Sequence, residues 1–176
     1  MEARDTELAI AHWKAKAERF GNPPPIAEFS LADLVAHSFR FIIGVDLLSN
    51  DDSIFLAYGQ GFAQRLGLSE RPSMRVPMIR CIPGRYRFLF LEGCSEATGQ
   101  LAPVQFSGEV AGVGGSELYR ACFMPLKMGL PTMLALYGSF NFRFRTAAEL
   151  AEQSQLADAG GSSSTSDLRP PAAKLN

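Results

Sequence analysis

The sequence predicts an α+β fold: a five-stranded antiparallel sheet with helices on one face, plus an N-terminal flanking helix. Three observations indicate it. The stretch 132–144 alternates apolar and mixed side chains, as a strand with one buried face does. The turns between the last three strand-like stretches are so short that these strands must be antiparallel neighbours. Stretches of helical period separate the second predicted strand from the third.

The size and charge of the chain limit the classes of function. A chain of 176 residues has room for one domain with short appendages. Its formal net charge of -1 gives no general attraction to nucleic acid or to an anionic membrane surface. Three widely spaced cysteines and a polar N-terminus favour a cytoplasmic protein with reduced thiols. The longest uncharged stretch, 128–142, is too short to span a bilayer, so we expect neither nucleic acid nor membrane as a partner.

The first part of the chain, 1–29, is expected to form a flanking helix and a linker. Ile10 and Trp13 belong to an apolar stripe of helical spacing over 6–20. The glycine and proline run 21–25 ends this helix. The narrow stripe suits either of two roles, packing on the chain's own domain or dimerisation.

The main domain is expected over 30–145, and it begins with a short helical stretch and a hairpin. The first strand is predicted at 39–47 and the second at 53–58, with a turn of Ser, Asn and Asp between them. A short helix follows at 60–68. The next residues, 69–83, have no clear period and are predicted to be loop with short helical turns.

A longer amphipathic helix is predicted over 84–99. Its apolar positions follow the helical period and are Tyr86, Leu89, Phe90, Gly93, Cys94 and Ala97. Three strands are expected after it, at 104–111, 117–126 and 132–144. They form a meander, because the turns between them are short.

The chain is expected to end in a short helix and a tail. Thr146 and Glu149 match a capping box, which starts a helix over 146–156. The remaining residues, 157–176, are rich in Gly, Ser, Ala and Pro and are predicted to be a disordered tail.

Several local features resemble the PAS family, specifically short bacterial PAS-like proteins of the alphaproteobacterial type. They are Trp13 followed by Pro25, the Tyr58–Phe62 segment, Pro103-Val104, Met124-Pro125-Leu126 and Phe140-Asn141-Phe142. The likeness covers 8–145. It implies a stand-alone sensory or signalling module without catalysis of its own, which binds a small ligand, docks on a signalling protein such as a sensor kinase, or does both. It also implies that the last strand lies centrally, between the first and the fourth.

Two alternatives remain open beside this interpretation. One is a ligand-free adaptor that dimerises through the N-terminal helix. The other is a small α+β isomerase-like enzyme, which needs an acidic base in an apolar pocket, with Asp46 or Glu92 as candidates. The sequence has no Gly-x-Ser-x-Gly motif, no phosphate-binding loop and no histidine near a Ser or Cys nucleophile, so we expect no enzyme.

Four residues are candidates for binding a ligand between helix and sheet: Tyr86, Phe90, Arg120 and Tyr137. The alternative for the aromatic residues is a filled core. Arg120 is a candidate because a cation on a middle strand requires an anion or a carboxylate, such as that of Glu109.

Five residues are candidates for docking a partner. Arg80, Arg85 and Arg87 lie around the start of the longer helix, where guanidinium groups suit an anionic surface, although a solvated basic loop explains them as well. Tyr137 and Asn141 are expected on the face of the last strand away from the helices. In PAS domains that face often meets a flanking helix or a second subunit, so a homodimer is possible there or through the N-terminal helix.

The sequence contains no cofactor motif that we recognise, and the identity of any ligand stays open. Cys81 is followed by Ile82-Pro83, which departs from the Asn-Cys-Arg-Phe-Leu motif of flavin-binding light sensors. No histidine lies in 84–99, where a haem ligand is expected. His12 and His37 have no Cys or carboxylate at zinc-ligand spacing.

Overall fold

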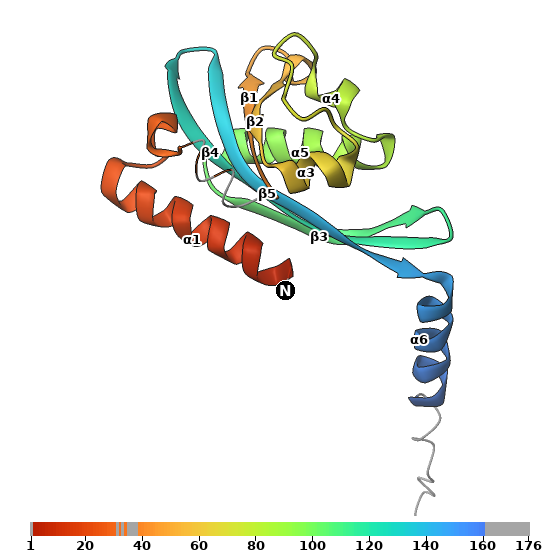
Figure 1. Cartoon of the computed structure of the whole chain (residues 1–176). Coiled ribbons are helices and arrows are strands. Elements are labelled where there is room, and N and C mark those ends of the chain that lie inside the picture. Colours follow the sequence, from red (N-terminus) through yellow and green to blue (C-terminus); the bar gives the residue numbers. More distant parts are fainter. Residues whose placement is uncertain (1, 31, 33, 35–38, 161–176) are drawn as a thin grey trace, which may run out of the picture.

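The computed structural model describes residues 2–30, 32, 34 and 39–160, and it confirms the α+β architecture. Its sheet contains β1 (Arg40–Asp46), β2 (Ile54–Tyr58), β3 (Val104–Gly112), β4 (Gly115–Leu130) and β5 (Met133–Thr146). The strands are antiparallel and lie in the order β2-β1-β5-β4-β3. The last strand therefore lies at the centre, paired with the first and the fourth, as the PAS resemblance implies (Figure 1).

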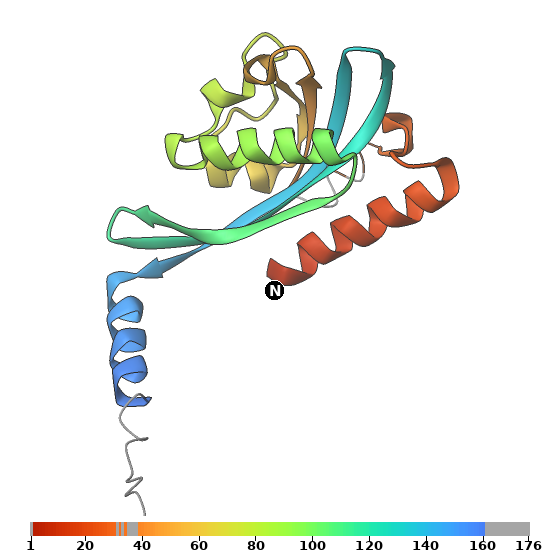
Figure 2. The same cartoon turned by 180° about the vertical axis from the view of Figure 1, so that it is seen from behind.

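Helices cover both faces of this sheet. One face carries α3 (Gln60–Leu66), α4 (Met78–Cys81) and α5 (Gly84–Gln100), and the opposite face carries α1 (Glu2–Phe20). Figures 1 and 2 show α1 crossing the sheet on the side away from α5. The remaining elements are the 3-10 turns η1 (Ile26–Glu28) and η2 (Asn50–Asp52) and helix α6 (Ala147–Gly160), which continues from β5 and extends away from the body of the fold.

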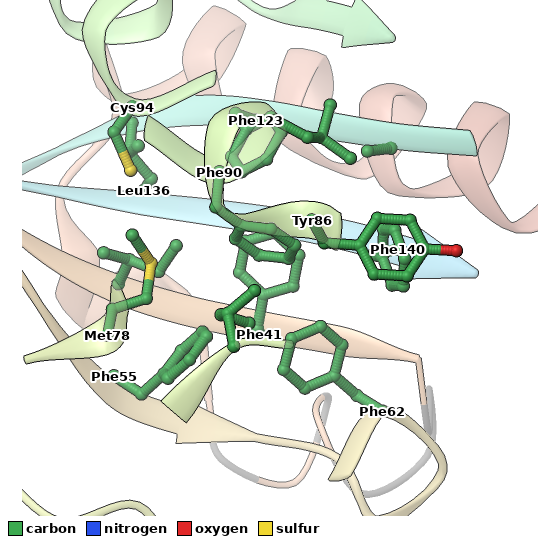
Figure 3. Packing of buried hydrophobic residues seen from close by; sticks show 14 of the residues in the cluster. Phe41, Phe55, Phe62, Met78, Tyr86, Phe90, Cys94, Phe123, Leu136 and Phe140 are labelled. Atoms are coloured by element: carbon green, nitrogen blue, oxygen red, sulfur yellow. The ribbon is translucent and has the colours of Figure 1, made fainter. Parts of the chain in front are cut away.

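The main core lies between α5 and the sheet and consists largely of interlocking aromatic rings (Figure 3). The Phe41 ring lies 5.0 Å from that of Phe62 and 5.5 Å from those of Phe90 and Phe123, centroid to centroid. All six apolar positions predicted for α5 are buried, which confirms its amphipathic period. Tilted and edge-on pairs at these distances add to the free energy of burial, about 1 kcal/mol for each pair.

Two glycines allow the main core to close this tightly. A Cβ atom on Gly93 of α5 would meet the ring of Phe123, and one on Gly138 of β5 would meet the ring of Phe41 and the carbonyl oxygen of Cys122. Both contacts would be well inside the 3.0 Å that real Cβ atoms keep. Helix α5 therefore approaches the sheet at a position where only a hydrogen atom fits.

A second core lies under α1 on the other face of the sheet. Ala9, Ile10 and Trp13 of α1 are buried there against sheet residues that include Met124 and Leu126. The Trp13 indole N–H donates a hydrogen bond of 2.8 Å to the carbonyl oxygen of Pro125. Of the two roles that the sequence allowed for this helix, the structure shows packing on the chain's own sheet.

Two helices extend beyond their predicted limits. Helix α1 begins at Glu2 instead of Thr6. Within its first turns Asp5 accepts a hydrogen bond from Ser139, and Thr6 is buried. Helix α6 extends to Gly160. Its capping box is confirmed, since the Thr146 N–H donates to a Glu149 carboxylate oxygen at 2.8 Å and the Glu149 N–H donates to the Thr146 hydroxyl at 3.3 Å.

Two predictions lie wholly or largely outside the described residues. They are the short helical stretch before the first strand, of which only Ala32 and Leu34 are described between 31 and 38, and the tail predicted over 157–176. Residues 157–160 of that tail belong to α6, so its predicted start is wrong, and the rest lies beyond the described residues.

Candidate functional site

Tyr86 and Phe90, two of the predicted ligand-binding residues, lie together in the main core. Both are fully buried. The Tyr86 ring packs edge-on against Phe140 at 4.8 Å, and the Phe90 ring lies 5.6 Å from the same ring (Figure 3). Side chains thus occupy the space between α5 and the sheet, which agrees with the filled-core alternative for these two residues.

Tyr86 also anchors a polar group at the edge of that core. Its hydroxyl donates a hydrogen bond of 2.7 Å to the carboxylate of Glu117 on β4. The Arg85 guanidinium donates to both oxygens of the same carboxylate, at 2.6 and 3.1 Å. Burial, and then the hydrogen bond to Glu117, raise the pKa of Tyr86 far above its ordinary value. The sequence did not reveal Glu117, because a carboxylate near the start of a strand is commonly a solvated side chain.

The three arginines near α5 are all exposed, and one of them is paired within the fold. Arg85 is committed to Glu117 within the fold. Arg80 and Arg87 are exposed, and the Arg87 side chain makes only a hydrogen bond of 3.3 Å to the carbonyl oxygen of Ile82 among the interactions of the described residues. Docking through Arg80 and Arg87 stays a prediction, whereas a partner would have to compete with Glu117 for Arg85.

Arg120 and Tyr137 lie on the opposite face of the sheet from Tyr86 and Phe90, so the four predicted ligand residues do not share a pocket. The reason is strand parity. Tyr137 alternates along β5 with Leu136 and Phe140, which face α5. The prediction of one pocket between helix and sheet that contains all four residues is therefore wrong.

Arg120 is exposed and lines a cavity of about 230 Å³ between α1 and the edge of the sheet. Thr6 and Glu7 of α1 and Gln105 and Ser107 of β3 also line it. Among the described residues Arg120 makes no ion pair. The predicted partner Glu109 instead accepts a hydrogen bond from the hydroxyl of Ser116.

Tyr137 and Asn141 lie on the predicted face of β5, but α1 packs on that face and limits its access to a partner. Tyr137 is only 1% exposed, because α1 and Phe29 cover it, and its ring lies 4.9 Å from that of Phe29. Asn141 is half-buried, and its side-chain oxygen accepts the N–H of Phe142 at 2.8 Å. Direct docking on Tyr137 therefore requires α1 to move.

A buried polar network joins α1 to the sheet beneath it. Arg40 of β1 is 1% exposed, and its guanidinium donates to the hydroxyl of Tyr137 on β5 and approaches the carboxylate of Asp5 on α1 at 3.5 Å. The Ser139 hydroxyl donates to the other Asp5 oxygen at 2.6 Å. Burial raises the pKa of Tyr137 to about 12. We refer to Asp5, Arg40, Tyr137 and Ser139 as the α1 network.

Sequence reasoning identified neither Asp5 nor Arg40 as a site residue, although one signal was present. Arg40 is followed by Phe41, Ile42 and Ile43, so it is a charged residue at the head of an apolar run. A guanidinium at such a position has to find a carboxylate or another oxygen partner. The same argument singled out Arg120, whose side chain is in fact exposed.

The residues named for the enzyme alternative, Asp46 and Glu92, are both half-buried. Asp46 is half-buried at the end of β1 and accepts the N–H of Leu48 at 2.8 Å. Neither Asp46 nor Glu92 lines the cavity beside Arg120. Within the described part of the chain, no group of His, Cys, Asp and Glu side chains is arranged to hold a metal ion. No described helix is long and apolar enough to cross a membrane.

No family model matches the chain, and no curated protein matches it. Among solved structures, the chain is similar to the PAS domain of BvgS from Bordetella pertussis. The similarity has a TM-score of 0.43 and 12% sequence identity, and it covers 76% of this chain and 97% of that domain.

Proposed function

We propose that the chain is a PAS-like signalling module that has no catalysis of its own and acts by docking on a signalling protein. One observation supports this above all: the α1 network ties a separate helix over the central strand of the sheet. The main core on the other face is filled by aromatic rings. The face under α1 is therefore the part of the fold that can change partners without opening that core.

The chemistry of the α1 network suits a reversible contact. Removing a guanidinium from water costs several kcal/mol, and hydrophobic side chains of similar volume often hold two elements together as well or better. The Nε atom of Arg40 has no hydrogen-bond partner among the described residues, so the cost of its burial is only partly offset. The network fixes where α1 lies along β5, and it binds α1 less tightly than an apolar contact could.

The face that α1 leaves when it moves away would select a partner by its chemistry. Displacement of α1 uncovers Cys122, Met124 and Leu126 as an apolar strip beside the guanidinium of Arg40. A partner helix with an apolar stripe and one carboxylate in the position of Asp5 would complete this surface. The PAS resemblance suggests a signalling protein, such as a sensor kinase, as the source of such a helix.

Cross-linking in cells, followed by affinity purification and mass spectrometry, tests this function. Asp5→Ala should increase the recovery of a signalling protein over the wild-type chain, because α1 then leaves the sheet more readily. Glu18→Ala is the matched control, since Glu18 is an exposed carboxylate on the same helix. Equal recovery from all three forms would contradict docking under α1.

Native mass spectrometry of the purified chain separates the alternatives. The dimeric adaptor predicts a dimer without a retained molecule, and a ligand sensor predicts a retained small molecule. The docking module predicts a monomer, and a small molecule retained away from the face under α1 would not contradict it.

A further inference from the structure

We propose that a second site, a half-open cavity between β2 and the segment that joins α3 to α4, binds a small neutral molecule built on a single ring. The cavity is lined by Phe55, Tyr58, Gly67, Leu68, Ser69, Pro72, Ser73, Val76 and Cys81. It lies on the face of the sheet that carries α3, α4 and α5, away from α1, and beside the filled core. This inference is therefore independent of the proposed docking function.

The volume of the cavity sets the size of the molecule. It measures about 210 Å³. An apolar protein cavity of about 150 Å³ is large enough to bind benzene. The present cavity therefore accepts one ring with a few substituent atoms, and it is too small for a nucleotide, a flavin or a haem.

The lining residues determine the chemistry of the molecule. Phe55, Leu68 and Val76 provide apolar walls, and no residue that lines the cavity carries a formal charge. A charged ligand would lose hydration there without gaining a counter-ion, which is costly. The hydroxyl of Ser73 supplies a polar contact. The ligand is therefore neutral, with an apolar ring and one hydrogen-bonding group.

The hydrogen bonds at the rim show which atoms remain for a ligand. The Tyr58 hydroxyl donates to the carbonyl oxygen of Ser69 at 2.8 Å, and the Ser69 hydroxyl donates to the carbonyl oxygen of Arg71 at 2.8 Å. The Ser73 hydroxyl oxygen accepts the N–H of Arg75 at 3.4 Å, which leaves its own proton for donation. A ligand oxygen facing Ser73 would accept that proton.

The floor of the cavity is rigid, whereas its rim is formed by a loop. The Phe55 ring lies 5.6 Å from Phe62 and 6.3 Å from Phe41 and Phe90, so the main core fixes it (Figure 3). The opposite side is the irregular segment after α3, where Val76 is exposed. A preformed aromatic floor with an adjustable rim is suited to a small ring, because little conformational entropy is lost on binding.

Cys81 provides a reporter inside the cavity. It is half-buried, whereas Cys94 and Cys122 are fully buried. Burial raises the pKa of all three thiols, and the rise is smallest for Cys81, which lines the cavity. Iodoacetamide should therefore alkylate Cys81 first, and a ligand in the cavity should protect it.

The experiment measures the alkylation rate of Cys81 by intact-protein mass spectrometry, with 4-methylphenol as the neutral probe and benzoate as its charged counterpart. At a 4-methylphenol concentration of about ten times Kd the rate should fall about tenfold, since only the empty cavity reacts. Benzoate should leave the rate unchanged. A rate that does not respond to 4-methylphenol would overturn the site, and equal protection by benzoate would overturn its neutral chemistry.

Ser73→Trp should fill the mouth of the cavity and abolish the effect of the probe, whereas Ser95→Trp, at an exposed position on α5, should retain it. The Ser73→Trp side chain could by itself prevent the alkylation of Cys81. The methyl NMR signals of Leu68 and Val76 therefore give a second measurement that does not depend on alkylation. They should shift with 4-methylphenol in the Ser95→Trp chain and remain fixed in the Ser73→Trp chain. Shifts of equal size in both chains would overturn the proposal.

Discussion

The hydroxyl of Ser139 donates a hydrogen bond of 2.6 Å to the carboxylate of Asp5, joining the start of α1 to the central strand across 134 positions of sequence. The same carboxylate faces the buried guanidinium of Arg40. One acidic side chain thus satisfies groups from two strands. The position of α1 on the sheet depends on this carboxylate as well as on the apolar contacts around Trp13.

Asp5→Ala should lower the free energy of unfolding by about 2 kcal/mol, because it leaves the buried Arg40 charge and the Ser139 hydroxyl without their acceptor. Urea denaturation measures this loss. The double variant Asp5→Ala/Arg40→Met should regain part of the stability, since it removes the charge that the single variant leaves unpaired. If the loss in the double variant equals the sum of the losses in the Asp5→Ala and Arg40→Met single variants, the two residues are not coupled.

Sequence patterns predicted most of the architecture, because the relevant signals are local or periodic. The apolar period of α5 identified its six buried residues, and the alternation in 132–144 identified the strand that lies at the centre. The capping box marked the start of α6 from two residues, Thr146 and Glu149. Each of these signals depends on side chains that are close together along the chain.

The candidate site was less predictable, because its residues are brought together by α1. Parity placed Tyr137 on the face away from α5, but no local pattern shows that a helix from the other end of the chain covers it. The pairing of Arg85 with Glu117 spans 32 positions and is equally invisible in a local pattern. Arg40 alone carried a usable signal, a cation at the head of an apolar run.

Gly93→Ala and Gly99→Ala should have opposite effects, although both glycines lie in α5. A methyl group at position 93 would overlap the buried ring of Phe123, whereas nothing lies within 4 Å of one at position 99. We expect Gly93→Ala to lower the melting temperature, with a loss of about 3 kcal/mol from overpacking. Gly99→Ala should raise stability by about 0.5–1 kcal/mol through helix propensity. Similar small effects of both changes would show that α5 lies farther from the sheet.

Tyr86→Phe should cost about 1 kcal/mol of unfolding free energy, because the Glu117 carboxylate loses a buried donor while the ring packing is retained. Chemical denaturation measures the change. Tyr119→Phe is the matched control, since Tyr119 packs edge-on against the same ring at 5.8 Å and has no hydrogen bond to Glu117. An effect of Tyr119→Phe as large as that of Tyr86→Phe would exclude the carboxylate as the cause.

Stability should fall as the pH rises above the ordinary range of the buried thiols and the buried tyrosines. Burial raises the pKa of Cys94, Cys122 and Tyr137 to about 12. In the unfolded chain these groups titrate at about 8.5 for Cys and about 10 for Tyr. Below the pKa that a group has in the unfolded chain, the group is protonated in both states, and its contribution to the unfolding free energy is complete. Between the unfolded and folded values the unfolded chain binds fewer protons, so the unfolding free energy decreases with pH.

Urea midpoints from pH 8 to 11 measure this decrease, and variants assign it to particular groups. Cys94→Ala should make the pH dependence shallower from about pH 8.5 upward. Tyr137→Phe should do so only above about pH 10, because the unfolded tyrosine begins to ionise there. Each variant has its own baseline stability, so the slopes are compared and not the midpoints. Slopes identical to that of the wild-type chain would mean that the folded protein does not keep these groups protonated.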